Sequence, residues 1–344
     1  MQAMVYRQTG DPGVIRAEEF DDPQPGPGEV LVKVAVSGVN PTDWKARAGD
    51  GSGAPPAAGW QIPNQDGSGL IVGVGQGVDP VLLHERVWLF ESAFQRPWGT
   101  AAQLTVVPAK QTVLLGPEGT YELGAALGVP FLTAHRCLTL GESMPDRLGP
   151  GALAGRTVLV QGGAGAVGNA AVQLARWADA TVIATVSSPE KAQLAAAAGA
   201  DHVIDYRTTD VAAEVRRIVP RGVDAIVEVS VANAATDTAV LGMHGSVALY
   251  AGSAGDSVTV PLREMMTINA RWQFVLVYTM PLRAKAFAVE DVAAAVVDGA
   301  IGVGPDHGLP LHRFPLAATA DAHAAVEASA VGKVLITVDD DPQA

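Results

Sequence analysis

The chain has 344 residues, of which 48% are hydrophobic and 17% are charged, and its formal net charge is −13. This length predicts two domains, each able to bury a sizeable core. The negative charge argues against nucleic acid or an anionic membrane surface as a partner. The single cysteine, Cys137, excludes internal disulfides and a thiolate-rich zinc site. No signal peptide and no apolar run of membrane-spanning length is visible, so we expect a cytoplasmic protein.

Short, closely spaced strands are predicted in the first third of the chain. Alternating apolar patterns occur at residues 30–36, 70–74 and 86–90, separated by turns rich in Pro and Gly. Such strands, with little helix between them, indicate a small β-barrel-like domain. A helical pattern begins near Tyr121, so we place the end of this domain at residue 122.

A glycine-rich turn follows a strand pattern in the middle of the chain and opens a helix pattern. The apolar run of residues 157–160 leads into Gly163, Ala164, Gly165, Ala166, Val167 and Gly168. Gly-x-Gly-x-x-Gly in this setting indicates a dinucleotide-binding turn. We expect Gly163 to permit the tight turn, Gly165 to let the backbone approach a pyrophosphate, and Gly168 to let helix and strand pack. A loop with no chemical role is the alternative.

Strand and helix patterns alternate beyond this turn. Further strands are predicted at residues 181–186, 202–204, 223–229, 246–250 and 272–277. Ser188 has the position of a helix N-cap, and Pro189 that of the first helical residue. This alternation predicts an α/β domain with a doubly wound parallel sheet, a Rossmann fold, over residues 123–280.

The second strand of this domain ends in two serines. NAD enzymes tend to place an acidic residue there, which binds the ribose 2′-hydroxyl. Here Ser187 and Ser188 end the strand and Lys191 follows. Two hydroxyls and an ammonium suit a 2′-phosphate, so NADPH is the expected cofactor. The alternative is that Lys191 is an ordinary surface lysine. Glu190 should point away from this site if Ser188 caps the helix.

Several short segments complete the pattern. They are residues 38–43, 66–69, 73–75, 133–134, 161–168, 188 with 191, 205–207 and 332–333. In these segments the chain resembles the medium-chain dehydrogenase/reductase superfamily, and its zinc-independent quinone oxidoreductase (zeta-crystallin-like) branch in particular. The resemblance implies a GroES-like catalytic domain, formed by residues 1–122 and 281–344, around a Rossmann NADP-binding domain of residues 123–280.

The resemblance also implies a catalytic site in the cleft between the domains, with Asn40, Asp43 and Thr133. We expect Asn40 to donate an amide hydrogen bond to the acceptor carbonyl, and Thr133 to meet the nicotinamide. Asp43 either fixes its loop or relays a proton, and a purely turn-capping role is an equal alternative. Solvent is an alternative proton donor. Further cofactor contacts are implied for Tyr206, near the adenine, and for Gly252, Phe274, Val275 and Lys333.

Zinc ligands of the wider superfamily are replaced in this chain. Zinc alcohol dehydrogenases have a cysteine where this chain has Ser37, and a His-Glu pair where it has Gln65 and Asp66. Their four-cysteine zinc lobe cannot form with one cysteine. We therefore expect no metal. Without zinc, hydride transfer to an already electron-poor acceptor is favoured over alcohol oxidation.

The expected function is NADPH-dependent reduction of a quinone or an α,β-unsaturated carbonyl, a small-molecule acceptor. One alternative is a stand-alone enoyl reductase of a biosynthetic pathway, and another is a low-turnover, NADPH-binding structural protein. We also expect a homodimer, because residues 272–278 form an apolar edge strand without charge or proline. The alternative is that a helix or loop of the same chain covers this edge.

Overall fold

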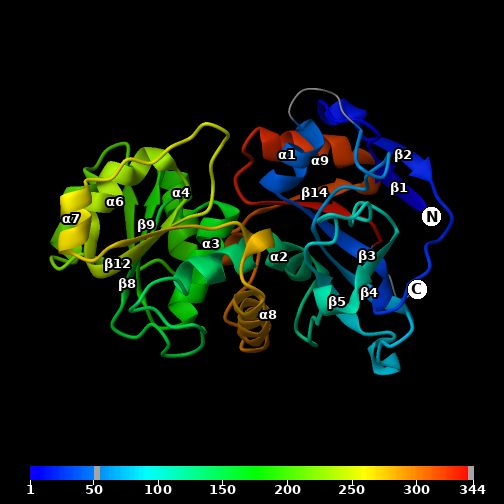
Figure 1. The fold of residues 1–344 in the computed structure, drawn as a ribbon, viewed down its shortest axis with the longest axis horizontal. Coiled ribbons are helices and arrows are strands. Elements are labelled where there is room, and N and C mark those ends of the chain that lie inside the picture. Colours follow the sequence, from blue (N-terminus) through cyan, green and yellow to red (C-terminus); the bar gives the residue numbers. More distant parts are fainter. Residues whose placement is uncertain (50–54, 340–344) are drawn as a thin grey trace. The chain divides into compact units, whose positions relative to one another are not determined.

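The computed structural model describes residues 1–49 and 55–339, and the described residues form two compact units (Figure 1). Unit 1 comprises Met1–Val129 and Pro310–Ala344, and unit 2 comprises Pro130–Leu309. The boundaries therefore differ from those predicted at residues 122 and 281. Helix α2 (Tyr121–Leu138) crosses the first of them.

Helix α8 (Leu282–Val297) lies in unit 2, whereas the sequence prediction assigned it to the other domain. Its buried Asp291 explains this placement. The carboxylate contacts the His135 imidazole at 2.8 Å and accepts hydrogen bonds from Arg147 and from the Leu148 backbone. All these partners belong to unit 2, and no helical periodicity in the sequence indicates them.

Within unit 2, all of whose residues are described, six parallel strands form one sheet. Its strands are β8 (Thr157–Val160), β9 (Thr181–Val186), β10 (His202–Asp205), β11 (Val223–Glu228), β12 (Leu241–Leu249) and β13 (Arg271–Phe274). Their order is β10-β9-β8-β11-β12-β13, the doubly wound order of a Rossmann fold. The predicted α/β fold is thereby confirmed.

The strands of unit 2 are apolar because helices cover both faces of a parallel sheet. Leu159, Ile183, Ile226 and Val247 are fully buried in one core cluster. The helices between the strands are α3 (Ala166–Trp177), α4 (Pro189–Ala197), α5 (Val211–Ile218), α6 (Ala234–Val240) and α7 (Leu262–Thr267) (Figure 1). Strand β13 ends at Phe274, earlier than predicted, because residues 277–279 turn into a 3-10 helix.

Unit 1 contains, among its described residues, a seven-stranded sheet and a two-stranded one. The larger sheet holds β14 (Leu311–Pro315), β15 (Lys333–Thr337), β3 (Glu29–Val39), β4 (Asp66–Val74), β5 (Arg86–Leu89), β7 (Thr112–Leu114) and β6 (Leu104–Pro108); the smaller pairs β1 (Gln2–Val5) with β2 (Arg16–Glu19). Apart from the parallel pair β14–β15, the strands of the larger sheet pair antiparallel. The predicted return of the C-terminal strands to the first domain is confirmed.

Helices α1 (Pro41–Ala48) and α9 (Thr319–Glu327) lie in unit 1, together with the first half of α2. The core of the unit includes Val30, Val32, Ile71 and Leu89, which are fully buried. Of the helices that the structure describes, none combines the length and the hydropathy needed to span a membrane.

Candidate functional site

The glycine-rich turn connects β8 to α3, as the sequence predicts, but a different glycine makes its tightest bend. Gly162 has a φ of +72°, a left-handed conformation that favours glycine, whereas Gly163 does not. A Cβ on Gly163 would lie 2.8 Å from the Cβ of Ala184 on β9. The expected role of Gly163 is thus corrected: Gly162 makes the turn, and Gly163 leaves room for the neighbouring strand.

The other two glycines of the motif differ in their surroundings. A Cβ on Gly168 would lie 2.3 Å from the Gly162 carbonyl oxygen, so Gly168 allows helix and turn to pack, as predicted. A Cβ on Gly165 would meet only that same oxygen, at an ordinary contact distance of 3.4 Å. Gly165 is exposed, and no side chain caps α3 at this N-cap position. The first amides of a 12-residue helix therefore begin at an open surface, which favours a bound anion.

Ser187, Ser188 and Lys191 lie together at the end of β9. The Lys191 ammonium donates a hydrogen bond to Ser187 Oγ at 3.0 Å. Ser188 Oγ accepts from the Lys191 backbone amide at 3.3 Å, so Ser188 is the N-cap of α4, as predicted. This local geometry places one positive charge and a hydroxyl side by side.

Glu190 lies on the first turn of α4, and the expectation that it points away from this pair stays a prediction. Its carboxylate is hydrogen-bonded to the Ser188 hydroxyl, and this bond, with a bond to a helix-start amide, lowers its pKa. The bond to Ser188 holds the Glu190 carboxylate at the N-cap hydroxyl of α4.

The remaining predicted cofactor contacts of unit 2 follow the same edge of its sheet. Because all six strands are parallel, the residues that follow their C-terminal ends meet at one edge, where open α/β sheets bind ligands. Tyr206 follows β10, is 52% exposed, and donates its backbone amide to Val186 at the end of β9. Gly252 lies in an exposed loop after β12, and Phe274 and Val275 lie at the end of β13. Thr133 lies on α2 and is buried.

Asp43 lies in unit 1, on the first turn of α1. Its Oδ2 accepts from the Asn40 backbone amide at 2.7 Å, and its Oδ1 from the Gln65 amide at 3.1 Å. Burial and the nearby Asp66 raise its pKa to about 8. Both oxygens are engaged by backbone donors, so the structure supports the capping alternative for Asp43.

Asn40 lies in a buried polar cluster with Asp66 and Lys333. Its Nδ2 donates to Asp66 Oδ2 at 2.7 Å, and its Oδ1 accepts from the Lys333 ammonium at 2.6 Å. All three residues are at most 2% exposed. The amide is thus bound on both sides, and a hydrogen bond from it to an acceptor carbonyl would compete with these contacts. The predicted role of Asn40 stays a prediction.

The ammonium of Lys333 and the carboxylate of Asp66 are 3.9 Å apart. Burial lowers the pKa of Lys333 and raises that of Asp66, and the attraction between the two charges opposes both shifts. The Val129 backbone amide also donates to Asp66. Lys333 is thus engaged by Asn40 and Asp66 within unit 1, and its predicted cofactor contact stays a prediction. In the sequence, Asp66 is marked only by the family-like segment 66–69 and as a replaced metal ligand, and no local signal connects it with Asn40 or Lys333.

Hydrogen bonds also surround Ser37, which stands where zinc relatives have a cysteine. Its Oγ lies 2.7 Å from Thr100 Oγ1 and accepts from Asn64 Nδ2, and Asn64 Oδ1 accepts from His323. Burial lowers the pKa of His323 to about 3, so its imidazole is neutral. In the part of the chain that the structure describes, no three His, Cys, Asp or Glu side chains are grouped as metal ligands.

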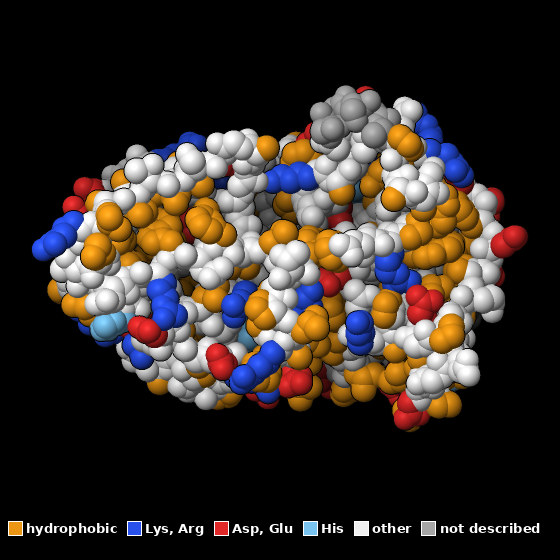
Figure 2. Space-filling view, in the orientation of Figure 1, with side chains coloured by type: hydrophobic (Ala, Val, Ile, Leu, Met, Phe, Trp, Pro, Cys, Tyr) orange, Lys and Arg blue, Asp and Glu red, His pale blue; other side chains and the backbone are white. Residues whose placement is uncertain are grey.

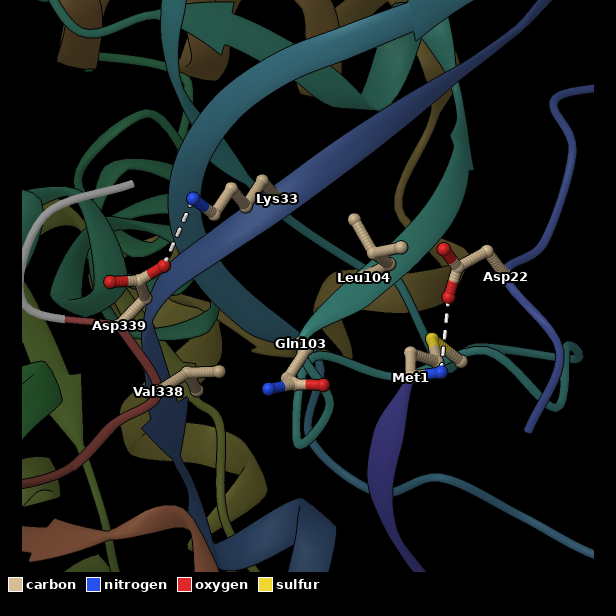
Figure 3. Close-up of a pocket in the computed structure, with 7 residues that line it drawn as sticks. All are labelled: Met1, Asp22, Lys33, Gln103, Leu104, Val338 and Asp339. Atoms are coloured by element: carbon tan, nitrogen blue, oxygen red, sulfur yellow. Dashed lines mark ion pairs between the residues drawn. The ribbon is translucent and has the colours of Figure 1, made fainter. Parts of the chain in front are cut away.

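Unit 1 also has a surface hollow of about 490 Å³, shown in Figure 3. Its charged groups are already paired. The Met1 amine contacts Asp22 at 3.0 Å, and the Lys33 ammonium contacts Asp339 at 3.2 Å (Figure 3). None of the predicted site residues lines it, so we assign it no part in the chemistry.

Comparison with known proteins agrees with this arrangement. A family model described as "Zinc-binding dehydrogenase" matches residues 166–294, and one described as "Alcohol dehydrogenase GroES-like domain" matches residues 26–117. Quinone oxidoreductase of Rattus norvegicus is 31% identical over 271 residues, which cover 77% of each chain.

Two further similarities extend this comparison. Synaptic vesicle membrane protein VAT-1 homolog of Rattus norvegicus is 32% identical over 73% of this chain, but the match spans only 58% of that protein. The solved structure of a mycobacterial protein complexed with NADPH is 29% identical, has a TM-score of 0.79, and is matched over 98% of this chain and 100% of its own.

Proposed function

Because the chain belongs to the quinone oxidoreductase branch of the medium-chain dehydrogenase/reductase superfamily, we propose that it transfers hydride from NADPH to a quinone or an α,β-unsaturated carbonyl. The observation that carries this proposal is the sheet edge of unit 2. There an uncapped helix start follows the glycine turn, and Lys191 stands beside Ser187. Together they offer sites for a pyrophosphate and a 2′-phosphate.

Each of the two anion sites would bind a different phosphate group of the cofactor. The amides at the start of α3 would hold the pyrophosphate, and the Lys191 ammonium with the Ser187 hydroxyl would hold the 2′-phosphate. We expect Tyr206, which is exposed and follows the neighbouring strand, to stack on the adenine. A mycobacterial structural relative is complexed with NADPH, which supports this choice of cofactor.

The cofactor and the protein have different roles in the reaction. When bound, the nicotinamide supplies the hydride that adds to the electron-poor acceptor. One proton must follow to complete the reduced product. Asp43 is poorly suited to deliver it, because both its oxygens accept from backbone amides. We therefore assign the proton to solvent. The protein contributes mainly by orienting cofactor and acceptor.

Zinc independence is part of the proposal. The Ser37, Asn64 and His323 side chains are bound to one another or to Thr100, an arrangement that offers one imidazole but neither a thiolate nor a carboxylate. Zinc in proteins is held mainly by Cys, His and carboxylate ligands. We also propose a cytoplasmic location, because the single cysteine, Cys137, is buried and forms no disulfide.

Turnover with a panel of acceptors tests the function. NADPH oxidation should be followed with quinones, enones and an enoyl thioester, each with and without a chelator. We expect turnover of a quinone or enone that the chelator leaves unchanged, together with no stoichiometric zinc by elemental analysis. A preference for the enoyl thioester would favour a biosynthetic enoyl reductase. NADPH binding without any turnover would favour a structural role.

We also propose that the chain forms a homodimer through β13, the edge strand of the unit 2 sheet. Phe274 is 62% exposed and Leu276 57% exposed, although the intervening Val275 is buried. Figure 2 shows further hydrophobic side chains on this face of unit 2, over α6 and α7. An exposed apolar edge strand promotes aggregation unless a partner covers it, and a two-fold partner covers it with the same surface.

Leu276→Asp should convert the dimer to a monomer and weaken NADPH binding, since Phe274 and Val275 lie in the same segment. Light scattering at micromolar concentration measures the first effect, and NADPH fluorescence titration the second. Leu282→Asp is the matched control, because Leu282 is 81% exposed but lies on α8. A parent protein that is monomeric and fully active would contradict the proposal.

A further inference from the structure

A chain of buried hydrogen bonds runs beneath the glycine turn of unit 2. The Gly162 amide donates to Thr185 Oγ1 at 3.2 Å, and that hydroxyl donates to Gln161 Oε1 at 2.6 Å. Gln161 Nε2 in turn donates to Asp237 Oδ1 on α6 at 3.0 Å. Thr185 is 1% exposed and Gln161 is 4% exposed, so solvent does not compete for these bonds. The turn that bends at Gly162 is therefore connected to Asp237 by three consecutive hydrogen bonds.

Asp237 faces a second buried carboxyl group, Glu228, at the end of β11. Both residues are fully buried, and their side chains are in hydrogen-bond contact. Glu228 Oε1 accepts from the Ser230 backbone amide at 2.6 Å and from Asn233 Nδ2 at 3.0 Å. The other two oxygens, Glu228 Oε2 and Asp237 Oδ2, have no donor among the described residues.

Two carboxyl groups in this position cannot both carry a charge at low cost, because they repel each other without water to screen them. The groups packed around them bring no compensating cation. Tyr250, which interacts with Glu228 and Cys137, is neutral, and so is Cys137, since burial raises the pKa of each. Arg216 on α5 donates instead to the Ala239 and Leu241 carbonyl oxygens. A single proton between Glu228 and Asp237 satisfies both orphaned oxygens.

We propose that Asp237 and Glu228 share one proton and that Asp237, through Gln161 and Thr185, is a positioning residue for the glycine turn that binds the cofactor pyrophosphate. The inference rests on the proposed function, because it concerns the geometry of the same cofactor site. It adds a residue to that site that touches no cofactor. Asp237 lies 76 positions from Gln161 in the chain, and no sequence motif connects the two.

The shared proton makes this support dependent on pH. Burial and the charge of Glu228 raise the pKa of Asp237 to about 9, and the pKa of Glu228 is raised as well. The proton is therefore held at neutral pH and is lost as the pH rises through about 9. Its loss leaves two facing carboxylates, which separate α6 from β11 and release the Gln161 amide. NADPH binding should weaken in that window.

A pair of substitutions at one position tests the proposal. In Asp237→Asn, the amide accepts from Gln161 and donates to Glu228, as the protonated acid does. In Asp237→Ala, both contacts are lost. We expect the Ala variant to bind NADPH roughly 5- to 10-fold more weakly than the parent at pH 7, the size of one lost buried hydrogen bond. The Asn variant keeps both contacts, so it should bind NADPH within about 2-fold of the parent.

The pH profile separates positioning from general stability. The dissociation constant of the parent should rise between pH 8 and 10, and that of Asp237→Asn should stay flatter over the same range. In the steady state, Asp237→Ala should raise KM for NADPH and leave kcat and the acceptor KM nearly unchanged. An Asn variant with the same alkaline loss as the parent, or a folded Ala variant with parental affinity, would overturn the proposal.

Thr185 provides a second test if Asp237→Ala does not fold. Thr185→Val removes the hydroxyl between Gly162 and Gln161 at nearly constant volume, and Thr185→Ser keeps it. The Val variant should lose NADPH affinity and the Ser variant should keep it; equal affinities would count against the proposal. Direct titration with NADPH needs no acceptor, so a parent that fails to bind NADPH would refute the proposed function instead.

Discussion

Replacing Lys191 with alanine is expected to raise the NADPH dissociation constant roughly 10- to 150-fold and to leave NADH binding nearly unchanged. The Lys191 ammonium lies 3.0 Å from Ser187 Oγ, and we propose that both contact the 2′-phosphate, which NADH lacks. A hydrogen bond between charged partners contributes about 1.5–3 kcal/mol, which corresponds to this range. Titration of both cofactors by fluorescence measures the effect.

Glu190→Gln is the matched variant for this test. Glu190 precedes Lys191 on the first turn of α4, and its carboxylate is hydrogen-bonded to Ser188. Removing this charge should tighten NADPH binding modestly and again leave NADH unchanged. Equal losses of NADPH and NADH affinity in Lys191→Ala would refute the assignment of the 2′-phosphate site.

Lys333→Met should destabilise the protein by about 3–5 kcal/mol, the cost of leaving a buried charge without its partner. Asn40 would lose the cation on its Oδ1, and Asp66 would lose the attraction that opposes the rise of its pKa on burial, so it would keep an unpaired charge or take up a proton in a site closed to water. Urea denaturation of the parent and the variant measures the change in the free energy of unfolding. The double variant Lys333→Met with Asp66→Asn should recover part of this loss, because neither charge then remains.

Lys33→Met provides the control for charge removal at the surface. Lys33 contacts Asp339 at 3.2 Å, but its side chain is 30% exposed. Exposed ion pairs contribute about 0–1 kcal/mol, so the change in unfolding free energy should stay below about 1 kcal/mol. A similar small change for Lys333→Met would show that the buried cluster does not depend on its cation.

Local patterns in the sequence were sufficient for much of unit 2. The strands over residues 157–160 and 181–186 and the N-cap Ser188 are where the periodicity and capping signals predict them. These features depend on neighbours a few residues away, so the sequence alone contains the information. The same holds for the association of Ser187 with Lys191, four positions apart.

Contacts between distant residues could not be read in this way. The length of β13 depends on the 3-10 turn that follows it, and the placement of α8 depends on the contact of Asp291 with His135, 156 positions away. Within the glycine motif, the sequence predicts a turn. Only the structure shows that Gly162 has the positive φ and that Gly163 packs against Ala184 on the neighbouring strand.

The sequence by itself determined that this protein has a Rossmann fold with a glycine-rich turn after its first strand and a lysine beside the serine that follows its second strand, since strand period, turn chemistry and helix caps are local properties. Only the tertiary structure decided what surrounds the candidate polar residues. Lys333 is bound to Asn40 across 293 positions, and Asp237 supports Gln161 across 76. A buried charge or shared proton is stable only next to its partner, and folding alone brings such partners together.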